Sequence, residues 1–174
     1  GDTRVAALVG LVDDDHHKLH LNLGVSLPTG DLDNTGTVLT PMNMQMEMRL
    51  PYAMQLGSGS YEFEPGVTYT GSDGNLGWGA QVKYRTALGG NNDEGYKLGD
   101  KLMATSWLAY SLSPAASLSF RLGYQHADEI EGMDPAIMAP VQTADPSNYG
   151  GTWWDASIGL NYVFQQGALR GHRV

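Results

Sequence analysis

A short stretch of the sequence carries methionine at every second position, at Met42, Met44, Met46 and Met48. In an extended backbone alternate side chains point to the same side, so these thioethers would share one face. Thioethers are soft ligands that suit Cu(I), which makes the segment a candidate metal site. The alternative, which we favour, is an adaptable apolar loop, because methionine fills irregular gaps. We therefore predict no bound metal or cofactor, and we expect His16 and His17 to lie at the opposite end of the molecule.

Residues 31–36 begin like a calcium-binding loop, with oxygen ligands at alternate positions and glycine in sixth place. The twelfth position holds Met42, where such a loop needs a bidentate glutamate. A turn built from Asp and Asn side chains explains the segment better, and the same interpretation suits residues 91–95. Both segments are therefore predicted to be loops without a bound ion.

A nucleophile for hydrolysis could come from Ser58 or Ser60, in a glycine-rich loop, and a base from His126 with Asp128. Such a set needs the nucleophile within hydrogen-bond reach of the base. Nothing in the sequence brings the two segments together, and glycine and serine are common in loops. We predict that the protein is not an enzyme.

The remaining polar residues alternate with apolar ones along several segments. These polar positions are His20, Asn22, Glu62, Glu64, Gln81, Lys83, Arg85, Arg121, Gln125, Asp155 and Asn161. Ionised side chains in a dry core are costly unless they are paired, whereas in a water-filled lumen they cost little. We predict that these residues line such a lumen. The sequence leaves open whether the charges form opposed walls that set ion selectivity or pair off and brace a filled lumen.

The elements that carry these residues are predicted to be β-strands. Residues 19–27 show the pattern most clearly, with Leu or Val at every odd position and a polar residue or glycine at every even one. A helix would spread these apolar side chains around its circumference, whereas a strand gathers them on one face. Further strands are predicted at residues 4–12, 61–70, 76–88, 101–112, 118–125 and 154–164.

The connections between these strands alternate between short and long. Short turns are expected at residues 13–17, 72–75, 113–116 and 165–167, and long irregular loops at 31–59, 89–100 and 129–151. Transmembrane β-barrels sort their connections in this way, while a soluble sandwich has no reason to. Aromatic residues on the apolar faces, mostly toward strand ends, are typical of the girdles at a membrane interface. They are Tyr61, Tyr69, Trp78, Tyr84, Tyr110, Tyr124, Trp154 and Tyr162.

Composition narrows the possible classes of protein. The chain of 174 residues is predicted to be one domain, residues 1–174, and it has no apolar run long enough for a transmembrane helix. Its net charge of −9 argues against a nucleic-acid partner, and the absence of cysteine excludes disulfides. About seven strands and the start of an eighth would leave open sheet edges, which lipid does not tolerate. We therefore expect the chain to be part of a longer one or one contribution to a multi-chain barrel.

Several motifs resemble a known family. They are LHLNLGVSLPTGD at 19–31, LPYAMQLGSGSYEFEPGVTYTG at 50–71, GWGAQVKYRTALGGNNDEGYKLGD at 77–100, TADPSNYGGT at 143–152 and GALRGHR at 167–173. Together they resemble the bacterial outer-membrane transporter family that is grouped with the MetA-pathway phenol-degradation proteins. The resemblance implies an outer-membrane β-barrel that helps small, often aromatic, compounds across the membrane. It implies no catalytic or binding residues, and the family's chains are longer at both ends and poorer in methionine near residue 45.

The sequence thus favours an antiparallel up-and-down transmembrane β-barrel of about seven or eight strands in a bacterial outer membrane. Its predicted role is that of a passive, porin-like conduit, with the lipid bilayer and small solutes as its partners. Two alternatives stay open: a structural or adhesive barrel without transport, and a soluble sandwich or lipocalin-like module that holds an apolar ligand inside. The substrate, the total strand number and the oligomeric state are not defined by the sequence.

Overall fold

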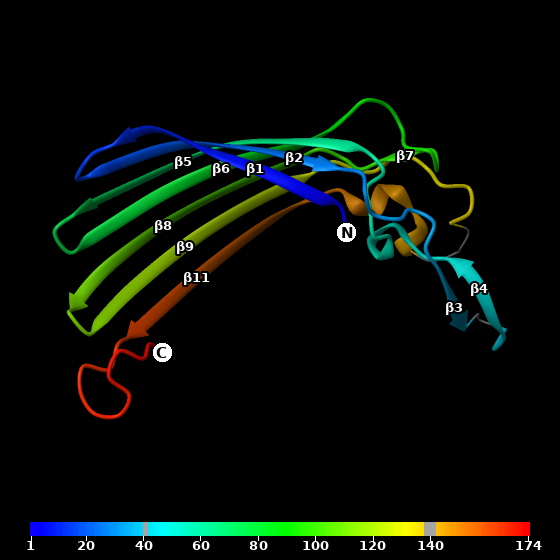
Figure 1. Cartoon of the computed structure of the whole chain (residues 1–174). Helices are drawn as coiled ribbons and strands as arrows, with labels where there is room; N and C mark the ends of the chain where they lie inside the picture. The colour runs from blue at the N-terminus through cyan, green and yellow to red at the C-terminus, as the bar shows by residue number, and fades with distance from the viewer. Residues whose placement is uncertain (40–41, 138–141) are drawn as a thin grey trace.

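The structure, a computed structural model, describes residues 1–39, 42–137 and 142–174. Its main element is a seven-stranded antiparallel sheet with the strand order β1-β2-β5-β6-β8-β9-β11. The strands are β1 (Thr3–Asp13), β2 (His17–Leu27), β5 (Tyr61–Asp73), β6 (Leu76–Leu88), β8 (Lys101–Ser113), β9 (Ala116–Ala127) and β11 (Gly151–Tyr162). Figure 1 shows that the sheet is a single arched layer. The prediction of an all-β, antiparallel chain is confirmed.

The sheet is open in the described part of the chain. Strands β1 and β11 each pair with one neighbour, and they do not pair with each other. Closure into a barrel therefore stays a prediction. The expected start of a further strand after residue 167 does not form a ladder: Val163 and Arg173 make an isolated bridge, and the chain folds back against the end of β11.

Short turns lie at one end of the sheet and long connections at the other (Figure 1). The turns span residues 14–16, 74–75 and 114–115. In the second turn Gly74 has a φ of 52°, a left-handed conformation that glycine adopts without strain. The long connections, residues 28–60, 89–100 and 128–150, gather at the opposite end, and their described residues are called the cap below.

The cap contains secondary structure that the sequence did not predict. Strand β3 (Thr35–Leu39) pairs with β4 (Gln45–Arg49), and β7 (Tyr96–Lys97) pairs with β10 (Glu131–Gly132). Three short 3₁₀ helices are also present, η1 (Tyr52–Met54), η2 (Gln142–Ala144) and η3 (Pro146–Tyr149). The expectation of wholly irregular loops was wrong here, because elements this short give too few residues for a periodic pattern. None of the helices in the described residues is long and apolar enough to cross a membrane.

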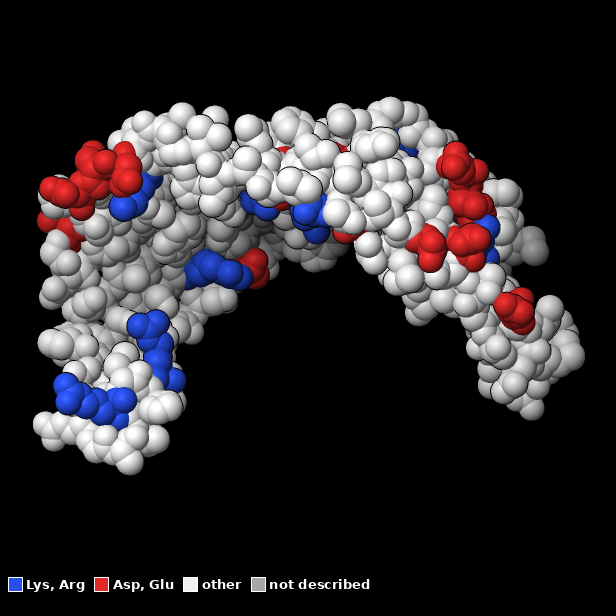
Figure 2. Space-filling view, in the orientation of Figure 1, with Lys and Arg blue, Asp and Glu red and all other residues white. Residues whose placement is uncertain are grey.

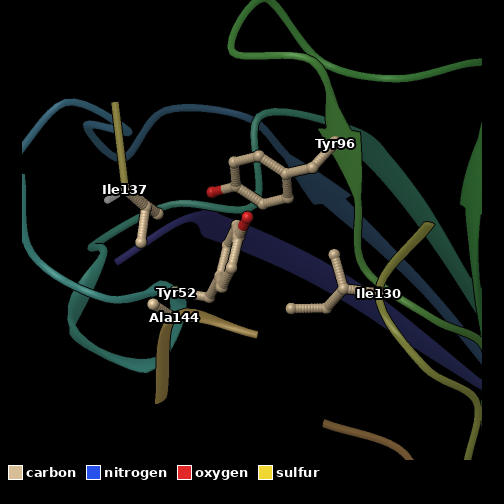
Figure 3. Close-up of a cluster of buried hydrophobic side chains, with 5 residues drawn as sticks. All are labelled: Tyr52, Tyr96, Ile130, Ile137 and Ala144. Carbon is tan, nitrogen blue, oxygen red and sulfur yellow. The ribbon is translucent and has the colours of Figure 1, made fainter. Parts of the chain in front are cut away.

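The buried hydrophobic core lies in the cap rather than under the sheet (Figure 3). It consists of Tyr52, Tyr96, Ile130, Ile137 and Ala144, with Leu98 and Tyr149 packed against them. Each of the long connections contributes at least one of these residues. The rings of Tyr52 and Tyr96 meet edge to face with their centroids 4.8 Å apart, and burial raises the pKa of both phenols. The cap is therefore one packed unit.

The apolar face of the sheet, by contrast, is exposed. Many of its large side chains, among them Leu108, Phe120 and Ile158, have more than a third of their surface exposed. The ladder register also places all of the predicted girdle residues on this face. One row lies near the cap and comprises Tyr61, Tyr84, Tyr124 and Trp154; the other lies near the turns and comprises Tyr69, Trp78, Tyr110 and Tyr162. A continuous apolar surface of this kind normally faces a partner or a membrane.

Candidate functional site

The register of the sheet brings the predicted lumen residues onto one face. Residues directly opposite each other in an antiparallel ladder point to the same side, and Thr68, for example, lies opposite both His20 and Gln81. Applied strand by strand, this rule groups His20, Asn22, Glu62, Glu64, Gln81, Lys83, Arg85, Arg121, Gln125, Asp155 and Asn161. Figure 2 shows charged groups on the hollow underside of the arch, while the convex surface over the middle of the sheet is white. The polar side is called the hollow face below.

Two buried glutamates lie at the centre of a cluster of ion pairs on the hollow face. Glu62 is 4% exposed and Glu64 is 9% exposed. Arg4 reaches both carboxylates, at 3.8 Å from Glu62 and 3.5 Å from Glu64. Lys83 contacts Glu64, and Arg85 Nε lies 3.8 Å from Glu62. Because a buried carboxylate without a cation is strongly unfavourable, these cations compensate for the burial of both glutamates.

The other polar residues of the hollow face make weaker contacts. Arg121 and Asp155 lie 3.4 Å apart, and each side chain is 59% exposed, so this pair adds little stability. Asn22 and Gln81 both donate to the Thr68 hydroxyl, at 2.9 and 2.7 Å. Each charged residue among those predicted to line a lumen thus has an ion-pair partner, which fits the alternative in which the charges pair off better than the one with opposed walls.

The hollow face also carries Arg4, Lys101 and Trp153, which the sequence pattern did not mark as candidates. The position of Arg4 was not predicted, because β1 has apolar residues on both faces and its sequence therefore does not show which residues share a face. Lys101 is the first residue of β8, directly opposite Arg85 in the ladder. Among the described residues no carboxylate lies within ion-pair distance of its ammonium group. A cavity of about 270 Å³ lies here, between the hollow face and the cap.

An ion-pair network holds the cap together beside its core. Arg49 Nη2 lies 2.9 Å from Glu94, and Arg49 Nε lies 3.4 Å from Oδ2 of Asp134, which is 1% exposed. The Asp134 N–H donates to the Tyr52 hydroxyl at 3.1 Å, and Asp134 Oδ1 accepts from the Ala136 N–H. These contacts join all three long connections. The sequence could not reveal the long-range contacts, because Arg49 lies 45 positions from Glu94 and Tyr52 lies 82 positions from Asp134.

The residues considered as a hydrolytic set make hydrogen bonds or ion pairs in two separate parts of the structure. The Ser58 hydroxyl donates to Asp2 at 2.8 Å. His126 contacts the Thr152 hydroxyl at 2.8 Å, and its other ring nitrogen lies 3.4 Å from Asp128. Within the described residues no hydrogen bond joins Ser58 or Ser60 to His126. The structure does not bring this candidate set together.

The methionine segment is extended only in part. Met46 and Met48 lie in β4 and share one side of it, whereas Met42 and Met44 precede the strand; residues 40–41 are outside the described part. His16 and His17 lie in or beside a turn at the far end of the sheet. No group of three His, Asp or Glu side chains in the described residues could hold a metal ion.

The two acidic loops form turns of the kind expected from Asp and Asn. The Asn34 side chain donates to the Asp31 carbonyl at 3.0 Å. In the second loop the Asn92 side-chain oxygen accepts from the backbone N–H groups of Glu94 and Tyr96. The amide side chains in both loops thus bind their own backbone.

Comparison with known proteins finds no family model that matches this chain and no curated protein that matches it. The resemblance drawn from the sequence motifs therefore stays a prediction. The features that bear on function are the two unlike faces of the sheet, the cap, and the cavity between the cap and the hollow face.

Proposed function

We propose that the chain forms the wall of a bacterial outer-membrane β-barrel that acts as a passive conduit for small solutes, of the phenol-degradation-associated transporter type. The observation that carries the proposal is the contrast between the two faces of the sheet. The convex face is apolar and exposed, and the hollow face is charged. In a membrane barrel the first would meet lipid and the second would meet water.

The spacing of the aromatic rows supports this proposal. At about 3.3 Å per residue, the stretch of β11 from Trp154 to Tyr162 is about 26 Å long. With a strand tilt of about 40°, its height along the membrane normal is about 20 Å, close to the apolar band of about 25 Å in known barrels. Rings at both ends of this stretch would lie at the two interfaces, where aromatic residues are favoured.

The separation of the connections gives the proposed barrel a direction. Outer-membrane barrels have short turns on the periplasmic side and long loops outside. The turns at residues 14–16, 74–75 and 114–115 would therefore face the periplasm, and the cap would lie at the cell surface. In lipid the free edges of β1 and β11 need strand partners, which under this proposal come from further strands or from other copies of the chain.

Curvature favours this proposal over the lipocalin-like alternative. A soluble module with an apolar ligand inside needs its apolar residues in the hollow. In this sheet the hollow carries Glu62, Glu64 and Lys83, while Leu108 and Ile158 point outward. A structural or adhesive barrel without transport has the same two faces, so it is separated from a conduit by experiment.

The test is expression with an export leader, followed by fractionation and gel mobility in detergent with and without boiling. We expect recovery in the outer-membrane fraction and a mobility shift on boiling. Planar-bilayer recordings then separate a conduit, which gives discrete conductance steps, from an adhesive barrel, which gives none. Recovery as a monomer in water without detergent would contradict the membrane assignment.

A further inference from the structure

The cavity between the hollow face and the cap has two chemically different walls. The sheet supplies Arg85, Lys101, Gln125 and Trp153, and the cap supplies Tyr52 and Tyr149. Its volume of about 270 Å³ lies just below the range of small-molecule sites, about 300–1,000 Å³. The space therefore suits a compact ligand rather than a chain or a polymer.

The sheet wall places two cations directly opposite each other. Arg85 and Lys101 are partners in the β6–β8 ladder. Like charges in this position repel and destabilise a sheet unless an anion lies between them. Arg85 and Arg4 share Glu62, which lies 3.8 Å from the Arg85 Nε atom, and no carboxylate of the described residues lies within ion-pair distance of Lys101. The neighbouring Lys83, by contrast, is paired with Glu64.

The cavity wall also holds donors that no described residue uses. The terminal guanidinium nitrogens of Arg85, the Lys101 ammonium and the Gln125 amide donate no hydrogen bond within the described chain. Among the described residues one carboxylate borders the cavity, that of Asp128, but it is 63% exposed and lies 3.4 Å from His126. The wall thus offers several donors to a ligand, and its two cations outnumber the one carboxylate that borders the cavity.

The cap wall consists of aromatic rings that are held in place. Tyr52 is 5% exposed, accepts the Asp134 N–H at its hydroxyl, and meets the Tyr149 ring edge to face at 5.5 Å. The Tyr149 hydroxyl donates to the Thr143 carbonyl at 2.7 Å. Rings fixed in this way lose little conformational entropy when a ligand binds. With Trp153 on the sheet side, they favour a flat, apolar body.

We propose that this cavity binds a small organic carboxylate whose charged group lies between Arg85 and Lys101 and whose apolar ring lies against Tyr52, Tyr149 and Trp153. A guanidinium matches the planar carboxylate geometry with two parallel donors. A single negative charge suits the site, because Glu62 already takes part of the Arg85 charge. The inference names the solute class of the proposed conduit and in that respect rests on the proposed function.

The test is calorimetric titration of the full chain, refolded in detergent micelles, with benzoate at pH 7.5. Benzamide provides the same ring without the charge, and acetate provides the charge without the ring. We expect saturable binding of benzoate and at least tenfold weaker binding of the other two. Equal binding of benzamide would overturn the anion site, and equal binding of acetate would overturn the ring pocket.

Substitutions of cavity residues test whether benzoate binds in this cavity. Lys101→Gln and Arg85→Gln should each weaken benzoate binding about tenfold or more, and Lys101→Arg should retain it. Arg121→Gln is the matched control, because Arg121 lies on the same face but does not line the cavity. If Arg121→Gln weakens binding as much as Lys101→Gln, the effect is a diffuse field and the site is refuted. The boiling-dependent gel shift verifies that each variant is folded.

The outcomes for the cavity and for the conduit can be told apart. A chain that inserts and conducts but shows no saturable benzoate binding overturns the cavity proposal alone. A chain that binds benzoate yet partitions into water without detergent overturns the membrane proposal and keeps the cavity.

Discussion

An arginine placed in the middle of the convex face is expected to destabilise the protein strongly in a bilayer. Leu108, on the interior strand β8, lies opposite Phe120, which in turn lies opposite Ile158 on β11. These residues are therefore at one level of the sheet. Ile158 is midway between Trp154 and Tyr162, the aromatic residues of its strand in the two rows. Under the proposed function this level is the midplane of the membrane.

The expected loss of stability follows from the depth of the substituted residue in the membrane. Arginine on the lipid face of a barrel costs about 2–4 kcal/mol at the midplane and about 0–1 kcal/mol near the interface. Leu108→Arg should therefore lower the free energy of unfolding in lipid vesicles by about 3 kcal/mol. With an m-value of about 3 kcal/mol/M in guanidinium chloride, the unfolding midpoint should fall by about 1 M. In water the same exposed site would change stability by about 0.5 kcal/mol or less.

The assay is reversible folding into lipid vesicles, followed by tryptophan fluorescence and by the boiling-dependent gel shift. Ala109→Arg is the matched control, because Ala109 is the next residue of β8 and points to the hollow face, opposite Ser119. Its substitution should cost less than 1 kcal/mol, since water would surround the new charge. Ile158→Arg repeats the test at the same level on another strand. If Leu108→Arg and Ile158→Arg are neutral while Ala109→Arg is costly, the assignment of lipid and water to the two faces is wrong.

Three further predictions concern the cap and its contact with the N-terminus. Burial raises the pKa of Asp2, but hydrogen bonds from Ser58 and the backbone outweigh it and hold the pKa below its usual value. The stabilisation of the folded state by ionised Asp2 is present above a pH of about 4 and is lost as the pH falls through the lowered pKa. Asp2→Asn should therefore lower the free energy of unfolding by about 1 kcal/mol at pH 7 and make Tm less dependent on acid pH. Tyr96→Ala removes a ring that is 1% exposed and should cost about 3–5 kcal/mol, seen as proteolytic cleavage within residues 89–100. Arg49→Gln leaves the Asp134 carboxylate buried without its cation and should cost about 3–5 kcal/mol, and Asp134→Asn in the same chain should recover part of it in a double-mutant cycle.

The strands could be predicted because the alternation of polar and apolar residues is visible within each strand's own sequence. Residues 19–27 alternate without exception, and Gly74 supplies the positive φ that its two-residue turn requires. The same alternation separated the two faces of the sheet before any register was known. The register itself adds only which residues are neighbours, and this was enough to bring Glu62, Glu64 and Lys83 together.

The cap and the cavity could not be predicted, because they depend on contacts between distant segments. Tyr52 and Tyr96 looked like ordinary loop residues, and nothing local distinguishes Arg49 from any exposed arginine. Lys101 follows the alternation of β8, but its importance comes from lying opposite Arg85, which only the strand pairing reveals. Composition argued for an acidic protein with a net charge of −9, yet the cavity combines two cations. Overall charge therefore says little about the chemistry of this site.

The two parts of the molecule are stabilised in opposite ways. The cap buries its own apolar residues and pairs its own charges, so it does not depend on lipid for its packing. The sheet exposes its apolar side chains and depends on a surrounding phase to cover them. The cavity lies where the two parts meet, with Tyr52 and Tyr149 held by the cap and Arg85 and Lys101 held by the strand ladder. Under the proposed function, substitutions on the convex face should thus change the stability of the sheet in lipid without changing the positions of Tyr52 and Tyr149. Ligand binding and membrane insertion should therefore respond to different substitutions.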